Sequence, residues 1–458
     1  MDSVRREKDS LGERDVPAQV YWGIHTLRAL ENFPLSARKV PRVLIMAMAQ
    51  VKQACAEANA DLGFLPADKA GVIVGACREV AEGALADQFP VDLLQGGAGT
   101  STNMNMNEVL ANRALELSGF SRGAYDRIHP LEHVNLHQST NDVYPTALKV
   151  AAIGQLRLLS ESVALLQGAF QRKENEFASI VKIGRTELQD AVPMTLGLEC
   201  AVWAEAFARD RWRTFKCEER LRVVNLGGTA IGTGLGAPRE YIFLVIEKLR
   251  ALTGFGLSRG ELPAGETANA DVFVEVSGIL KALASNLVKI GNDLRHLNYL
   301  GELRLAALQA GSSIMPGKVN PVIPEAVIQA GLQVMANDFL VTESASRGSF
   351  QINEFLPLLA GALLDSLELL INASRILARH VDQIEANASG CREYFDRSRM
   401  IVTAFVPAIG YEKARDLLKE FDSCGRADLR VFLTERLGGE LVDKVLAPHN
   451  LTALGYKK

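Results

Sequence analysis

Three stretches of the sequence place apolar side chains at steps of three and four residues over many turns, a pattern typical of long helices. Helices of this length are uncommon in ordinary domains. Their apolar seams predict a mainly α chain built on a bundle of long helices, which also favours association with other subunits. The seam positions are Leu148, Ala152, Leu156, Leu159, Val163, Leu166, Phe170 and Phe177; then Val276, Leu280, Leu283, Leu287, Ile290 and Leu294; then Leu363, Leu367, Leu370, Leu377, Val381 and Ile384.

Few stretches show the alternation of apolar and polar residues that is typical of strands. The chain also lacks the pattern of a strand, a glycine-rich loop and a helix in succession, which argues against a dinucleotide-binding fold. The glycine-rich segment from Asn225 to Pro238 is interpreted as a connector between long helices, with a ligand-binding role as the second choice. Turn-forming residues near 140 and from Ala388 to Cys391 predict three parts: residues 1–139, 140–388 and 389–458.

The composition is that of an ordinary globular protein, with 48% hydrophobic and 23% charged residues among 458. Because 50 basic residues face 54 acidic ones, the chain has no basic surplus to bind nucleic acid. We find no apolar run of membrane-spanning length and expect no membrane partner. The N-terminus is charged and lacks a signal-peptide core, and the six cysteines are scattered, so we expect a cytoplasmic protein with reduced thiols and no metal site.

Four polar, glycine-punctuated segments interrupt the apolar pattern: Gly96 to Glu108, His137 to Thr146, Gly184 to Pro193 and Ala310 to Glu325. Taken singly, each is explained by helix capping, because Ser, Thr and Asn are preferred N-caps. Together they offer many hydroxyl, amide and ammonium groups, which suit carboxylates. They predict a site for a small anionic substrate.

The last of these segments is the most specific. Gly311 and Gly317 bracket a short run that begins with Ser312, which predicts a loop with tight turns. A serine can serve as a base only if backbone amides or cations stabilise its alkoxide. Lys318 supplies a positive charge nearby.

The run GSSIMPGKVNP, from Gly311 to Pro321, resembles the signature of the aspartase/fumarase superfamily. GTSTNMNMNE and HQSTNDVYPT resemble its two other shared regions, and the flanking sequences are most similar to the aspartate ammonia-lyase family. The resemblance implies a three-part, mainly α chain whose central bundle assembles into a homotetramer with a twenty-helix core. Each active site would be shared by three subunits. Such enzymes convert L-aspartate reversibly to fumarate and ammonia without an organic cofactor, and Mg2+ activates some of them.

The resemblance also implies a role for each matching residue. Ser312 matches the base that removes a proton from Cβ. The β-carboxylate, which takes up the charge as an aci-carboxylate, would be held by Thr100, Ser139, Thr140 and Ser313. The α-carboxylate would be held by Thr186, Lys318 and Asn320, and the amino group would face Asn141 and Glu187.

Position 187 departs from the family, which carries histidine or glutamine there, whereas this chain has Glu187. A carboxyl group suits an amine better than water and so favours an ammonia-lyase. His137 also replaces a usual serine, and we interpret it as structural. The stretch from Leu294 to Gln309 is shorter than in most relatives. Two alternatives remain: fumarate hydratase, or a non-catalytic protein with the same fold.

Overall fold

The computed structural model describes residues 3–456, which form two compact units. Within the described residues, unit 1 contains 3–159, Arg213–Lys281 and Gln333–Leu369; unit 2 contains Ser160–Trp212, Ala282–Leu332 and 370–456. Five long helices contribute to both units: α5 (Thr140–Glu176), α6 (Leu196–Leu221), α9 (Asp271–Tyr299), α10 (Val322–Ala345) and α11 (Leu356–Val381). The prediction of a mainly α chain with long helices is confirmed.

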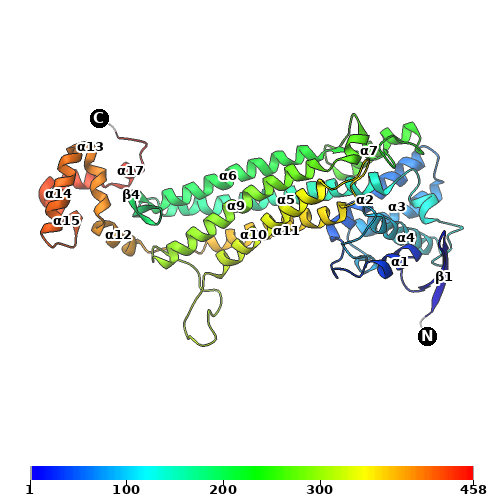
Figure 1. Ribbon diagram of the computed structural model, residues 1–458, viewed down its shortest axis with the longest axis horizontal. Coiled ribbons are helices and arrows are strands. Elements are labelled where there is room, and N and C mark those ends of the chain that lie inside the picture. The colour runs from blue at the N-terminus through cyan, green and yellow to red at the C-terminus, as the bar shows by residue number, and fades with distance from the viewer. Residues whose placement is uncertain (1–2, 457–458) are drawn as a thin grey trace. The chain divides into compact units, whose positions relative to one another are not determined.

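The helices pack through the predicted seams, since every seam residue is buried. Within unit 2, Phe170 of α5 stacks on Phe207 of α6 with ring centroids 5.7 Å apart. Within unit 1, the Ser277 hydroxyl of α9 donates to Asp338 of α10 over 2.9 Å. Figure 1 shows these helices as the bundles that run through each unit. The repeat of three and four residues therefore encodes packing within one chain.

Apolar side chains on two other long helices, α6 and α10, remain exposed. Trp212, Phe215 and Phe339 are each more than 60% exposed. The predicted seams are covered within the chain, so any apolar surface left for association is formed by these other residues. Large exposed apolar patches commonly mark association surfaces.

Helix α11 is long and apolar enough to cross a membrane by length and composition alone, which corrects the expectation that no segment is. However, 72% of its most apolar window is buried inside the protein. This burial favours a core helix.

Smaller elements surround the bundle segments of each unit. Unit 1 also contains β1 (Val4–Asp9), β2 (Gly12–Pro17), α1 (Ile24–Asn32), α2 (Arg42–Asp61), α3 (Ala67–Ala81), η1 (Ala86–Gln88), α4 (Thr100–Leu117), η2 (Pro130–Val134), β5 (Val223–Val224), α7 (Arg239–Thr253), β6 (Ser258–Arg259) and α8 (Pro263–Ala268). Unit 2 also contains β3 (Val181–Thr186), β4 (Gln189–Thr195), β7 (Leu303–Arg304), β8 (Glu385–Ala386), α12 (Ala388–Arg397), η3 (Arg399–Phe405), α13 (Val406–Ile409), α14 (Tyr411–Ser423), α15 (Leu429–Leu437), α16 (Gly439–Val445) and α17 (Pro448–Leu451).

Helices begin close to both predicted domain boundaries, α5 at Thr140 and α12 at Ala388. The two compact units divide the chain differently because the long helices run through both. The division into residues 1–139, 140–388 and 389–458 therefore stays a prediction.

Candidate active site

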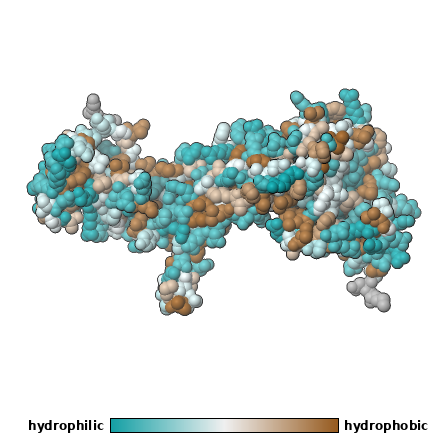
Figure 2. Space-filling view, viewed as in Figure 1, coloured by the Kyte–Doolittle hydropathy of each residue, from teal (hydrophilic) through white to brown (hydrophobic). Residues whose placement is uncertain are grey.

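The loop between β7 and α10 carries four of the predicted site residues: Ser312, Ser313, Lys318 and Asn320. It projects from the helices of unit 2, and its tip is apolar (Figures 1 and 2). Two hydrogen bonds close its neck: the Gly311 amide donates to the Lys318 carbonyl over 2.7 Å, and Asn320 Nδ2 donates to the Gly311 carbonyl over 2.8 Å. A Cβ at Gly311 would lie 2.7 Å from the Lys318 carbonyl oxygen, so this closure requires glycine.

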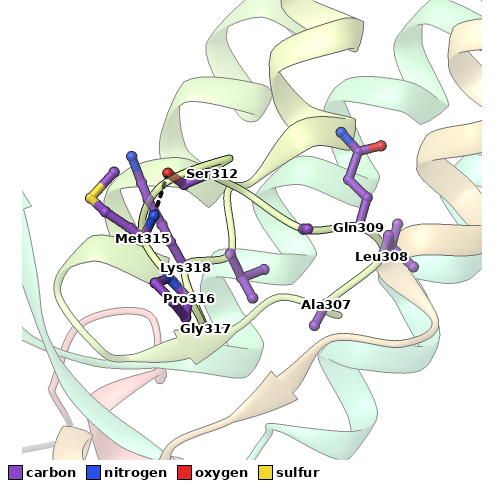
Figure 3. Close-up of a pocket in the computed structure, with 10 residues that line it drawn as sticks. Ala307, Leu308, Gln309, Ser312, Met315, Pro316, Gly317 and Lys318 are labelled. Carbon is purple, nitrogen blue, oxygen red and sulfur yellow. Dashed lines mark hydrogen bonds between the residues drawn. The ribbon is translucent and has the colours of Figure 1, made fainter.

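Two backbone amides donate to the Ser312 hydroxyl oxygen within this loop. The amide nitrogens of Ile314 and Met315 lie 3.2 and 3.0 Å from Ser312 Oγ, and Figure 3 shows the hydroxyl turned back toward the Met315 amide. Fixed donors of this kind stabilise negative charge on oxygen. The two amides are therefore placed to stabilise the alkoxide of Ser312, as a serine base requires.

A pocket of about 390 Å³ lies inside the loop and is lined by both Ser312 and Lys318 (Figure 3). Met315 and Val319 give its wall an apolar part. The pocket therefore combines a hydroxyl, an ammonium group and apolar walls, as small-ligand sites commonly do. The Ser313 side chain is exposed on the same loop.

Thr186 and Glu187 lie at the tip of the hairpin formed by β3 and β4. Glu187 and Leu188 both have positive φ, of 53° and 61°, as the two-residue turn of a tight hairpin requires. The side chains of Thr186 and Glu187 are exposed there. In unit 2 the hairpin is thus placed to present both residues to a ligand or to another subunit.

A buried ion cluster ties this hairpin to the base of the Ser312 loop. Glu302 immediately precedes β7, and its carboxylate lies 2.7 Å from Lys182 Nζ and 2.7 Å from Arg185 Nη1. The side chains of Lys182 and Glu302 are only 2% and 4% exposed. Removing one partner of such a buried pair typically costs about 3–5 kcal/mol, so the cluster fixes the two segments firmly.

In unit 1, Ser139 caps helix α5. Its Oγ accepts from the Asn141 amide over 3.2 Å, while Asp142 Oδ1 accepts from the Ser139 amide over 3.0 Å. This reciprocal pair resembles a capping box. The capping role expected for a polar segment is therefore present, and it leaves the Ser139 O–H proton free to be donated to a ligand.

Thr140 is buried, and its hydroxyl oxygen accepts from Asn103 Nδ2 of α4 over 3.1 Å. Asn103 Nδ2 also donates to Asn135 Oδ1, which accepts from Lys52 Nζ over 2.8 Å. Because Thr140 Oγ1 accepts from the amide, the hydroxyl proton points elsewhere. Burial lowers the pKa of Lys52 to about 8, so this network still carries a mostly protonated ammonium at pH 7.

The N-termini of α4 and α5 meet in unit 1. Gly99, just before α4, packs so closely on Tyr144 of α5 that a Cβ would lie 2.3 Å from its ring. Two helix N-termini together favour a bound anion. Thr100 is exposed at the start of α4, where its hydroxyl donates to the Gly97 carbonyl over 2.7 Å and would have to turn to reach a ligand.

The predicted site residues thus fall into two sets. Thr100, Ser139, Thr140 and Asn141 lie together in unit 1, whereas Thr186, Glu187, Ser312, Ser313, Lys318 and Asn320 lie in unit 2. His137 belongs to neither set, since its Nδ1 lies 2.6 Å from Asn59 Oδ1 and its ring contacts Phe64 and Tyr241. The interpretation of His137 as structural is confirmed.

Asn103 and Lys52 were missed as supports for Thr140. Lys52 had a signal in the sequence: it is the one cation in the interior of the apolar and alanine-rich α2, whose other cation, Arg42, is its first residue. Among residues 3–456 no cluster of three or more His, Cys, Asp or Glu side chains is arranged to hold a metal ion.

Known proteins match this chain over nearly its whole length. A sequence family described as lyases matches residues 12–336. An aspartate ammonia-lyase of Pseudomonas aeruginosa is 46% identical and aligns over 98% of this chain and 97% of its own.

Two solved structures are similar to the whole fold. A fumarate lyase:delta crystallin from Brucella melitensis, bound to cobalt, has a TM-score of 0.94 and 45% identity over 99% of this chain and 100% of its own. A class II fumarase from Schistosoma mansoni has a TM-score of 0.91 and 34% identity over 97% of this chain and 98% of its own.

Proposed function

On the premise that this chain belongs to the lyase family matched over residues 12–336, with aspartate ammonia-lyases among its close relatives, we propose that it is an aspartate ammonia-lyase. It would interconvert L-aspartate with fumarate and ammonia. The observation that carries the proposal is the pair of backbone amides on Ser312 Oγ in a lysine-bearing pocket. These groups suit proton removal beside a carboxylate.

The proposed reaction is an elimination in two steps. The Ser312 alkoxide takes a proton from Cβ, and the electron pair moves into the β-carboxylate to give a dianionic aci-carboxylate. The pair then returns to form the Cα–Cβ double bond while the bond from Cα to nitrogen breaks and ammonia leaves. Because charge accumulates on the β-carboxylate, donors such as Ser139 and Thr140 would stabilise the transition state most.

The remaining roles follow from the family match. Lys318, Thr186 and Asn320 would hold the α-carboxylate, and Glu187 and Asn141 would face the amino group. Thr100 and Ser313 would complete the donors to the β-carboxylate. The reaction uses no organic cofactor, and no step is assigned to Mg2+. The six free cysteines accord with a cytoplasmic enzyme.

We also propose a homotetramer in which three subunits build each site. The two sets of site residues and the exposed Trp212, Phe215 and Phe339 support this assembly. Sedimentation of the purified protein should give the mass of four chains. A stable monomer with full activity would contradict both the assembly and the shared site.

The direct test is the absorbance of fumarate near 240 nm when the protein meets L-aspartate, with L-malate as the rival substrate. Fumarate from aspartate and not from malate is expected. Preference for malate would instead support the alternative of a fumarase, which the class II fumarase fold keeps open. If neither L-aspartate nor L-malate is converted to fumarate, the result would favour a non-catalytic protein.

The variant Glu187→Gln is expected to stay active on aspartate with a changed KM, because the amide keeps the shape of the side chain but loses the negative charge that would face the ammonium group. Steady-state rates over a range of aspartate concentrations would reveal the change. Glu412→Gln, an exposed substitution in α14, serves as the control. If kcat and KM of Glu187→Gln both match those of the parent enzyme, Glu187 lies outside the site.

A further inference from the structure

The turn at the tip of the β3–β4 hairpin has a strained backbone. Glu187 and Leu188 both adopt a positive φ, of 53° and 61°. Asparagine and glycine favour such a turn, whereas glutamate and leucine are strained in the left-handed region. Strain of this kind persists only where the surrounding structure enforces it, and it often occurs at functional sites. A contact close to the turn is therefore expected to hold it.

Arg185, two residues before the turn, is placed to provide this contact. Its side chain is 16% exposed, and Nη1 lies 2.7 Å from Glu302 Oε1. The guanidinium also lies over the ring of Tyr394 of α12, 5.1 Å from its centroid. Tyr394 in turn donates to Asp190, the residue that pairs with Arg185 across the hairpin. Three segments of unit 2 thus enclose Arg185.

The register of the hairpin favours the same contact. The pairing of β3 with β4 shifts between Ile183 and Arg185. In a regular strand Lys182 and Arg185 would point to opposite faces, because side chains alternate. Here both pair with Glu302, each over 2.7 Å. Because an irregularity of this kind re-aims side chains, the hairpin brings two cations to one buried carboxylate.

Thr186 lies between Arg185 and the strained turn. Its side chain is exposed, and within residues 3–456 its hydroxyl makes no hydrogen bond. The hydroxyl therefore keeps its full capacity to bind a ligand. Because a β-branched side chain is stiff at χ1, the backbone on either side sets where that hydroxyl lies.

We propose that Arg185 is a positioning residue, anchored by Glu302, which keeps the strained turn and the Thr186 hydroxyl in the arrangement that binds the α-carboxylate. The inference rests on the proposed function, in which Thr186 contacts that carboxylate. Such a contact exists in both the ground state and the transition state. Loosening it should therefore change KM more than kcat.

The test is Arg185→Gln, which leaves Glu302 paired with Lys182. The KM for L-aspartate is expected to rise roughly three- to tenfold, part of what one hydrogen bond to a charged group contributes, with kcat changed less. In the background of Thr186→Ala the same substitution should add no further rise. In the background of Ser139→Ala, which lies in unit 1, its effect should add in full. An unchanged KM, or equal effects in all three backgrounds, would overturn the inference.

The variant Leu188→Gly tests the role of the strained turn separately. Glycine adopts the left-handed conformation without strain, so the turn would form without an anchor. In this background Arg185→Gln should raise the KM by less than about twofold. A rise as large as in the parent enzyme would overturn the inference.

Arg157→Gln is the matched control. Arg157 likewise pairs with a buried glutamate, Glu218, which keeps a second cation in Arg222. Its guanidinium also lies over an aromatic ring, that of Phe255. The variant should lose stability without changing the KM for L-aspartate. A comparable rise in KM would show that losing such a pair loosens the whole protein, and would overturn the inference.

If Arg185→Gln fails to fold, Arg185→Lys decides. It keeps a cation for Glu302 but loses the planar group over Tyr394, so the KM should rise roughly two- to threefold, and less in the background of Leu188→Gly. An unchanged KM in that folded variant would overturn the inference. If the parent protein itself converts no L-aspartate, the proposed function is rejected and this inference with it.

Discussion

Replacing Ser312 with alanine is expected to lower kcat by about 10²- to 10⁴-fold, the usual contribution of a general base, while L-aspartate still binds. The hydroxyl that receives the amides of Ile314 and Met315 is the group that would hold the alkoxide. Its removal raises the barrier to proton transfer but leaves the carboxylate contacts in place. The KM should therefore change little.

Steady-state rates and binding of a non-reacting dicarboxylate measure the two effects separately. Ser423→Ala removes an exposed hydroxyl of α14 from the same unit and should behave as the parent enzyme. A kcat close to the parent value in Ser312→Ala would show that another group takes the proton. Loss of binding together with turnover would show that the loop had collapsed.

Replacing Lys318 with alanine is expected to raise the KM for aspartate by roughly 10- to 150-fold, as the loss of one hydrogen bond to a charged group does. The ammonium group lines the same pocket as Ser312. A bond to the α-carboxylate exists in both the ground state and the transition state, so kcat should fall far less than kcat/KM.

The control for this variant is Lys419→Ala, which removes an exposed lysine of α14. Both proteins should sediment as the same assembly. An unchanged KM in an intact Lys318→Ala assembly would exclude the proposed contact with the α-carboxylate. A fall in kcat alone would place Lys318 at the reacting centre instead.

The seams show what periodicity can determine. Their steps of three and four residues placed every one of the predicted positions in the buried interior, because the helical repeat brings them to one face. The conformation of the Ser312 loop also depends on residues close together in the sequence. Its two glycines predicted tight turns, and the turn that follows Ser312 brings the two amides to its oxygen.

The environment of Asn141 and Thr140 depended on the tertiary structure. Asn141 Nδ2 meets the Ala230 carbonyl 89 residues away, and Thr140 Oγ1 meets Asn103 Nδ2 from another helix. The sequence around Asn141 and Thr140 does not indicate either partner. Asn and Ala are common residues, and long-range hydrogen bonds do not recur at a fixed spacing along the chain. The segment from Asn225 to Pro238 accordingly looked like a connector, although it orients a predicted site residue.

The amino-acid sequence by itself thus determined the helices, their buried faces and the turn around Ser312, because these depend on residues a few positions apart. The tertiary structure decided which hydroxyls keep a proton to donate, which end of the Asn141 amide is free and which carboxylate anchors Arg185. Those outcomes depend on long-range contacts, whose geometry is set by the packing of whole helices and not by any short pattern of residues.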